Sequence, residues 1–106
     1  MEKPNLNYIK ELSEGDQDFE NKLIGVLKKE LPLEFKEFQQ NFNEKNFIKT
    51  AENVHKLKHK ISILGLTKGY EEAALFENDL KNHQDTMRYD SFVQVIKSMM
   101  DFLRPR

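Results

Sequence analysis

The sequence has 106 residues, which is enough for one compact domain with a single core and too few for a catalytic domain with an accessory one. No apolar run approaches the roughly 20 residues that span a bilayer, and the N-terminus lacks the apolar core of a signal peptide, so we expect a cytoplasmic protein without membrane contacts. The absence of cysteine excludes disulfides, thiolate zinc sites and cysteine nucleophiles.

The formal net charge of −1 conceals an uneven distribution of charge. Residues 1–44 carry ten acidic and six basic side chains, whereas residues 45–68 carry six lysines against Glu52 alone. A local positive field of this kind can steer an acidic partner toward one face of the protein. A lysine-rich run is more often only a solvated helix face, so the charge indicates where to look and not what is bound.

The first 44 residues predict two helices. Leu6, Ile9 and Leu12 indicate a short helix that the turn-forming residues 13–16 should end, with Asp16 as the N-cap of the next helix. A long amphipathic helix follows, because apolar residues recur every three or four positions at Phe19, Leu23, Leu27, Leu31, Phe35, Phe38 and Phe42. Pro32 lies inside this stripe without changing its phase, which predicts a kink and not a break.

Three further helices are predicted after a turn at residues 43–46. Asn46 suits the N-cap of a third helix, Gly65 a left-handed residue at its end, and Thr67 the cap of a fourth helix. The third helix has its apolar stripe at Phe47, Ala51, Val54, Leu57, Ile61 and Leu64; the fourth has Tyr70, Ala73 and Leu80; the fifth has Tyr89, Phe92, Ile96, Met99 and Leu103.

These elements predict an all-α fold. The four main helices have short connections, which favours an antiparallel up-down four-helix bundle, here preceded by a short extra N-terminal helix. We expect a single domain over residues 1–106 that is monomeric, because each predicted stripe can be buried within the bundle. The starting methionine and the lack of linkers favour a free-standing protein.

His55, Lys58 and His59 are the candidate functional residues of the third helix. Residues three and four positions apart share a helix face, and this face lies about 100° round from Val54, at the edge of the core stripe. The imidazoles should therefore be reachable from water. The alternative is that the three side chains only form a solvated face of a charge-rich helix.

Glu77 adds a second observation, because it places an acid where the periodicity of the fourth helix asks for an apolar residue. If the third and fourth helices are antiparallel and joined near Gly65, Glu77 and His55 lie at nearly the same height. Glu77 could then hydrogen-bond one ring nitrogen of His55 and leave the other as a nucleophile. The alternative is that Glu77 lies at the margin of the stripe and points to solvent.

At these residues the sequence resembles histidine-containing phosphotransfer (HPt) domains, the phosphoryl carriers of multistep two-component phosphorelays. Their signature is a histidine, any residue, Leu, Lys and Gly, with a second glycine ten residues after the histidine. This sequence has His55-Lys56-Leu57-Lys58-His59, with Gly65 at the tenth position. The opening "L…GD…F…L…F…E.P" pattern also matches over residues 7–38, and Phe76-Glu77 stand where the family commonly has Leu followed by Glu or Gln.

The resemblance implies a role for each of these residues. His55 would be the phosphorylated histidine of a signal-transduction phosphoprotein, Lys58 would offset the phosphoryl charge, and Glu77 would orient the imidazole. His59 departs from the pattern, because the family usually has glycine there. A second imidazole could crowd the docking partner, bond the phosphoryl oxygens or compete for the phosphoryl group.

The resemblance also implies the partners of the reaction. They would be the receiver domains of a hybrid sensor histidine kinase and of a response regulator, and the receiver would supply the phosphoryl aspartate and Mg²⁺. We expect no cofactor in this chain and no kinase activity, since the sequence has no ATP-binding motif.

Three alternatives remain open. Histidines four residues apart can begin a transition-metal site, for which only Glu77 or His83 could add ligands, but Lys56 and Lys58 would repel a dication. A nucleic-acid binder is disfavoured by the isoelectric point near 6.3 and by the lack of aromatic residues among the lysines. An adaptor with the HPt fold would dock on a receiver domain without carrying phosphate, because His59 hinders transfer.

Overall fold

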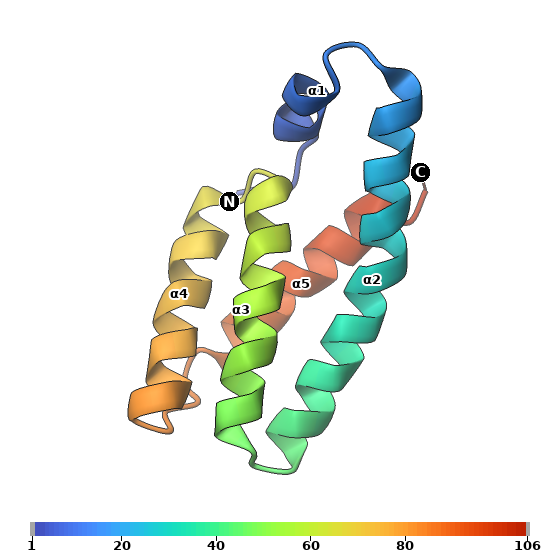
Figure 1. The fold of residues 1–106 in the computed structure, drawn as a ribbon. Coiled ribbons are helices and arrows are strands. Elements are labelled where there is room, and N and C mark those ends of the chain that lie inside the picture. Colours follow the sequence, from blue (N-terminus) through green and yellow to red (C-terminus); the bar gives the residue numbers. More distant parts are fainter. Residues whose placement is uncertain (1, 106) are drawn as a thin grey trace.

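The computed structural model describes residues 2–105, and within them the fold is all-helical, as predicted, with no strand. The five helices are α1 (Asn7–Ser13), α2 (Gln17–Asn43), α3 (Phe47–Ile63), α4 (Thr67–Asn82) and α5 (Tyr89–Leu103) (Figure 1). None of the helices in this part of the chain combines the length and the apolar character that a membrane crossing needs.

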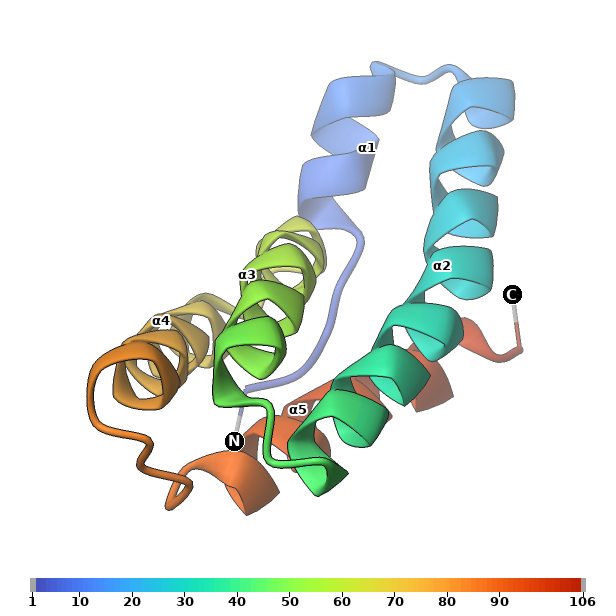
Figure 2. The ribbon, with the colours of Figure 1, turned by 60° about the horizontal axis from the view of Figure 1, so that its bottom comes forward.

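α3 and α4 lie side by side and antiparallel, and α2 runs antiparallel to α3 on the other flank (Figure 1). α5 crosses behind these helices at an oblique angle, and both views place it against α2 and α4 (Figure 2). The first turns of α2 extend past the end of α3, where α1 is the helix that faces them (Figure 1). α3 is therefore held between α2 and α4 and exposes only its outer face.

Local capping starts α2 and α3 as predicted. The side chain of Asp16 accepts a hydrogen bond from the backbone N–H of Phe19 at 3.1 Å, and that of Asn46 accepts one from Lys49 at 3.2 Å. Pro32 lies inside α2 without ending it. This is consistent with the uninterrupted phase of the apolar stripe on both sides of the proline.

The prediction that Thr67 caps α4 is wrong. Thr67 is the first residue of the helix, and no side chain at the preceding position makes a capping hydrogen bond. The carboxylate of Glu2 instead accepts hydrogen bonds from the backbone N–H groups of Lys68 and Gly69, at 2.9 and 3.0 Å. A carboxylate at a helix N-terminus satisfies free N–H groups and complements the helix dipole, so the N-terminal segment replaces the local cap.

Gly65 ends α3 in the left-handed conformation that was predicted, with φ of 78°. The N-terminal segment also closes over this turn, because the backbone N–H of Asn5 donates to the carbonyl of Leu64 at 2.9 Å. A Cβ atom at position 65 would lie only 2.5 Å from Asn5 Nδ2. The backbone angle therefore favours glycine, and any other residue here would also displace the side chain of Asn5.

The core runs along the inner faces of α2, α3, α4 and α5 and is apolar. At its centre the Phe38 ring is fully buried and lies 5.1 Å from that of Phe92 and 6.3 Å from that of Phe76, measured between ring centroids. Some apolar residues of the predicted helices are exposed instead, namely Leu12 at 48%, Phe19 at 42% and Tyr70 at 37%. Leu23, Phe42, Phe47 and Tyr89 are partly buried. Phe19 belongs to the first turn of α2, and the first turns of this helix extend past the end of α3.

Candidate functional site

The core fixes the orientation of the helices that carry the predicted site residues. Val54 and Leu57 of α3 are fully buried, so His55 and Lys58 follow them round the helix to the margin that faces α4. On α4, Phe76 is fully buried, and the next residue, Glu77, is turned toward α3. The candidate site is therefore built on two rigid and packed helices.

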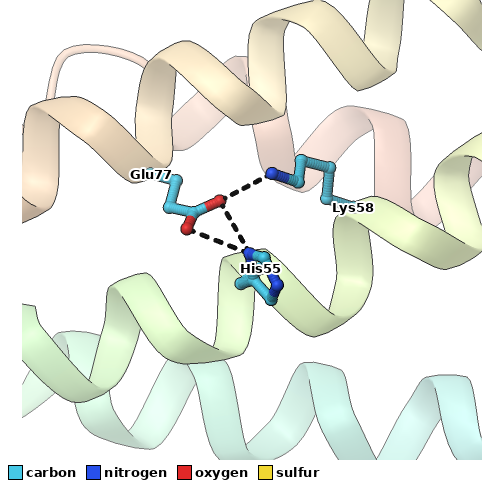
Figure 3. A network of polar contacts seen from close by, with 3 residues as sticks. All are labelled: His55, Lys58 and Glu77. Atoms are coloured by element: carbon cyan, nitrogen blue, oxygen red, sulfur yellow. Dashed lines mark hydrogen bonds and ion pairs between the residues drawn. The ribbon is translucent and has the colours of Figure 1, made fainter.

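Glu77 bridges His55 and Lys58, as Figure 3 shows. Its Oε2 lies 3.1 Å and its Oε1 3.3 Å from Nδ1 of His55, while Nζ of Lys58 lies 3.0 Å from Oε1. The predicted contact between His55 and Glu77 is therefore present. The alternative in which Glu77 points to solvent is wrong, because its side chain is only 15% exposed and has two partners.

The contact with Glu77 determines which ring nitrogen of His55 carries a proton. An ionised carboxylate can only accept hydrogen bonds, so Nδ1 of His55 carries the proton that is shared with Glu77. In the neutral ring the other nitrogen, Nε2, then has a free lone pair. That nitrogen lies on the side of the ring away from Glu77 (Figure 3), and the His55 side chain is 53% exposed. Nε2 can thus act as a nucleophile or a metal ligand toward a molecule that approaches from solvent.

Lys58 is more buried than an ordinary surface lysine, with a side chain that is 13% exposed. Besides its ion pair with Glu77, its Nζ lies 5.5 Å from the centroid of the Tyr70 ring, which is within the range of a cation–π contact. Tyr70 was predicted to face the core, but it lies at the surface beside Lys58. Tyr70 and Glu77, seven residues or two helical turns apart, were predicted on one stripe of the fourth helix, and both contact Lys58.

His59 lies one turn after His55 and contacts it directly. The centroids of the two rings are 4.9 Å apart and the ring planes are nearly perpendicular, at 88°. His59 is exposed, as predicted. The structure therefore brings all four predicted site residues together on one margin of the α3–α4 pair.

On the other side of His55, a shallow groove of about 420 Å³ runs between α3 and α4. It is lined by Ala51, Glu52, His55, Lys56, Glu77 and Lys81. Lys81 was missed by the sequence analysis, although it follows Glu77 by one helical turn and so lies on the same face of α4. Two lysines thus flank the groove beside the exposed imidazole.

The alternative of a metal site would need further ligands beside His55 and His59. Across residues 2–105, no group of three or more His, Cys, Asp or Glu side chains is arranged to hold a metal ion. His83, one of the two further ligands considered, is exposed at the C-terminal end of α4.

Comparisons with models of known protein families, with curated proteins and with solved structures gave no match.

Proposed function

We propose that this protein is a histidine phosphotransfer protein of a multistep phosphorelay. In this proposal, His55 accepts a phosphoryl group from the aspartate of one receiver domain and passes it to another. The observation that carries the proposal is an exposed imidazole whose Nδ1 is held by a largely buried carboxylate, Glu77. The resemblance of the His55 segment to the HPt signature supports it, as does the all-helical fold, in which α2–α5 would form the four-helix bundle and α1 the extra helix.

The transfer step follows from the tautomer of His55. The lone pair on Nε2 attacks the phosphorus atom of the aspartyl phosphate, a bond forms between nitrogen and phosphorus, and the bond from phosphorus to the aspartate oxygen breaks. The aspartate leaves as a carboxylate, and the imidazole keeps its Nδ1 proton and gains positive charge. Glu77 offsets that charge. The reverse attack by a second receiver's aspartate returns the ring to its neutral state.

Little further machinery is needed in this chain, because phosphoryl transfer depends mainly on in-line positioning and charge neutralisation. Lys58, which already pairs with Glu77, supplies positive charge beside the imidazole. In the proposal the receiver domains of a hybrid sensor kinase and of a response regulator are the partners, and they bring the Mg²⁺. The chain is then a cytoplasmic monomeric carrier and has no kinase activity of its own.

The test is transfer of a labelled phosphoryl group. Receiver domains encoded by the same genome are phosphorylated with labelled acetyl phosphate, separated from it and mixed with the protein. The wild type and His83→Gln should take up the label, and His55→Gln should not. His83 is the matched control, since it is an exposed histidine outside the site. Uptake by His55→Gln would contradict the assignment of His55.

The second candidate is an adaptor that docks on a receiver domain without accepting phosphate. It is favoured by one observation, the ring of His59 against that of His55, where the HPt pattern has glycine. Binding to a receiver domain without uptake of label, followed by uptake in His59→Gly, would support the adaptor. Uptake by the wild type would exclude it.

A further inference from the structure

His59 lies close enough to His55 to contact a group that is bound to the His55 imidazole. In Figure 3, Nε2 of His55 lies on the side of the ring toward the point where Lys58 joins α3. His59 is the next residue after Lys58, one helical turn after His55. The two imidazoles are already in edge-to-face contact, with centroids 4.9 Å apart. A phosphoryl group on Nε2 extends a further ~3 Å from the ring, so its oxygens come within hydrogen-bond reach of His59.

The carboxylates of α2 and α4 that face these turns of α3 are paired with lysines. From α4, Glu77 faces the site but is already paired with Lys58 and His55; from α2, Glu30 and Glu34 face the other flank and are both paired with Lys60. The titratable groups of α3 itself over these turns are Glu52, His55, Lys56, Lys58, His59 and Lys60. Lys58 and Lys60 are the lysines that pair with Glu77, Glu30 and Glu34, so these carboxylates do not face the site as unpaired charges.

We propose that His59, in its protonated form, donates a hydrogen bond to an oxygen of the phosphoryl group on Nε2 of His55. Protonation of His59 then stabilises phosphorylated His55, and phosphorylation of His55 stabilises protonated His59. This inference rests on the proposed phosphorylation of His55 and assigns a role to the residue that departs from the HPt pattern. An imidazole ordinarily titrates near pH 6.5, and a phosphoryl group is close to a dianion at neutral pH. Protonation of His59 and phosphorylation of His55 are thereby coupled.

The expected size follows from Coulomb attraction. A dianion about 4 Å from an exposed imidazolium should raise the affinity of His59 for its proton about tenfold, which moves its titration about one pH unit upward. By linkage, protonation of His59 raises the stability of phosphorylated His55 by the same factor. A purely structural role for His59 predicts neither effect.

The experiment loads the full chain chemically, with potassium phosphoramidate, so that no receiver domain is required. The ring resonances of all three histidines are followed by NMR through a pH titration before and after loading. We expect His55 to be modified and the titration of His59 to move upward by about one unit, while that of His83 stays in place. In His55→Gln, the same treatment should leave His59 unchanged.

Each other outcome overturns the inference. If His55 is phosphorylated and the titration of His59 does not move, the inference fails while the proposed function stands. If the phosphoryl group is found on His59, or on neither histidine, both the inference and the choice of His55 fail. His59→Lys provides a second measurement, because a permanent cation should make the partition of label between receiver and His55 nearly equal at pH 6 and pH 8. In the wild type, this partition should differ between pH 6 and pH 8. In His59→Gln it should be the same at both pH values, and phosphorylated His55 should not be stabilised.

Discussion

Helix α3 carries two largely buried lysines, Lys58 on the side that faces α4 and Lys60 on the side that faces α2. The two lysines differ in the number of carboxylates that surround them. Toward α4, Lys58 and His55 share the single carboxylate of Glu77. Toward α2, Lys60 lies between two carboxylates, 3.1 Å from Glu30 and 2.9 Å from Glu34. The two lysine side chains are 13% and 14% exposed, so burial does not distinguish them.

The two clusters of charged side chains differ in their net charge. The α4 flank is neutral with a neutral imidazole and positive with a protonated one, because one acid meets two basic groups. The α2 flank has a net charge of −1, because one lysine meets two acids. An incoming phosphoryl group is therefore not repelled by the first cluster, whereas the second cluster repels it. The α4 flank can serve a reaction, while the α2 flank only joins two helices.

The largest effect that tests this comparison is expected from Glu77→Ala. Nδ1 of His55 would lose its acceptor, so the ring would populate both tautomers and rotate freely, and Lys58 would lose its ion pair. We expect the initial rate of label uptake from a phosphorylated receiver to fall about 100-fold.

Glu77→Gln is the matched control, because its amide oxygen can still accept the hydrogen bond from Nδ1 but carries no charge. Its rate should fall by less, about tenfold, or ~1.4 kcal/mol in the barrier. A Glu77→Ala protein that remains folded by circular dichroism and takes up label at the wild-type rate would show that the α4 flank is only structural.

The complementary change on the α2 flank is Glu34→Gln. It removes one charge from a largely buried hydrogen bond to Lys60, so the free energy of unfolding should fall by about 1–2 kcal/mol in a urea titration. The rate of label uptake should stay at the wild-type value, since nothing at His55 changes. An equal loss of phosphoryl transfer in this variant would break the distinction between the flanks.

The register of the site could be predicted from the sequence, because it depends on helix periodicity and one short turn. His55 and Glu77 lie at similar distances from Gly65, so an antiparallel pair brings them together. The caps at Asp16 and Asn46 were equally local and were predicted correctly. What these features share is that the partners lie within a few residues or within one helical hairpin.

The remaining features depend on contacts that no local pattern contains. Glu2 replaces the expected cap at Thr67, because its carboxylate accepts a hydrogen bond from the backbone N–H of Lys68, 66 residues further along the chain. Phe19 is exposed in the first turn of α2, a helix that continues past α3, and relative helix length is a property of the assembled fold. Tyr70 lies at the surface beside Lys58 and not in the core. Helix periodicity alone does not distinguish between these two environments.

The smallest expected effect concerns the pH dependence of the α2 flank. Partial burial lowers the pKa of Lys60, but hydrogen bonds to Glu34 and Glu30 outweigh burial and raise that pKa above its ordinary 10.5. The folded protein therefore holds this proton more tightly than the unfolded chain does. The resulting stabilisation is complete below about pH 10.5 and is lost as the pH rises through the higher folded value.

Lys60→Gln should accordingly be less stable than wild type by about 1 kcal/mol at neutral pH, and the gap should close as the pH rises beyond the folded pKa of Lys60. Thermal unfolding of both proteins from pH 7 upward measures the gap, and their difference cancels the titration of other lysines and tyrosines. Lys36→Gln, an exposed change on α2, should stay close to wild type throughout. A gap for Lys60→Gln that stays constant at alkaline pH would mean that packing of the lysine's alkyl chain, and not its charge, joins α3 to α2.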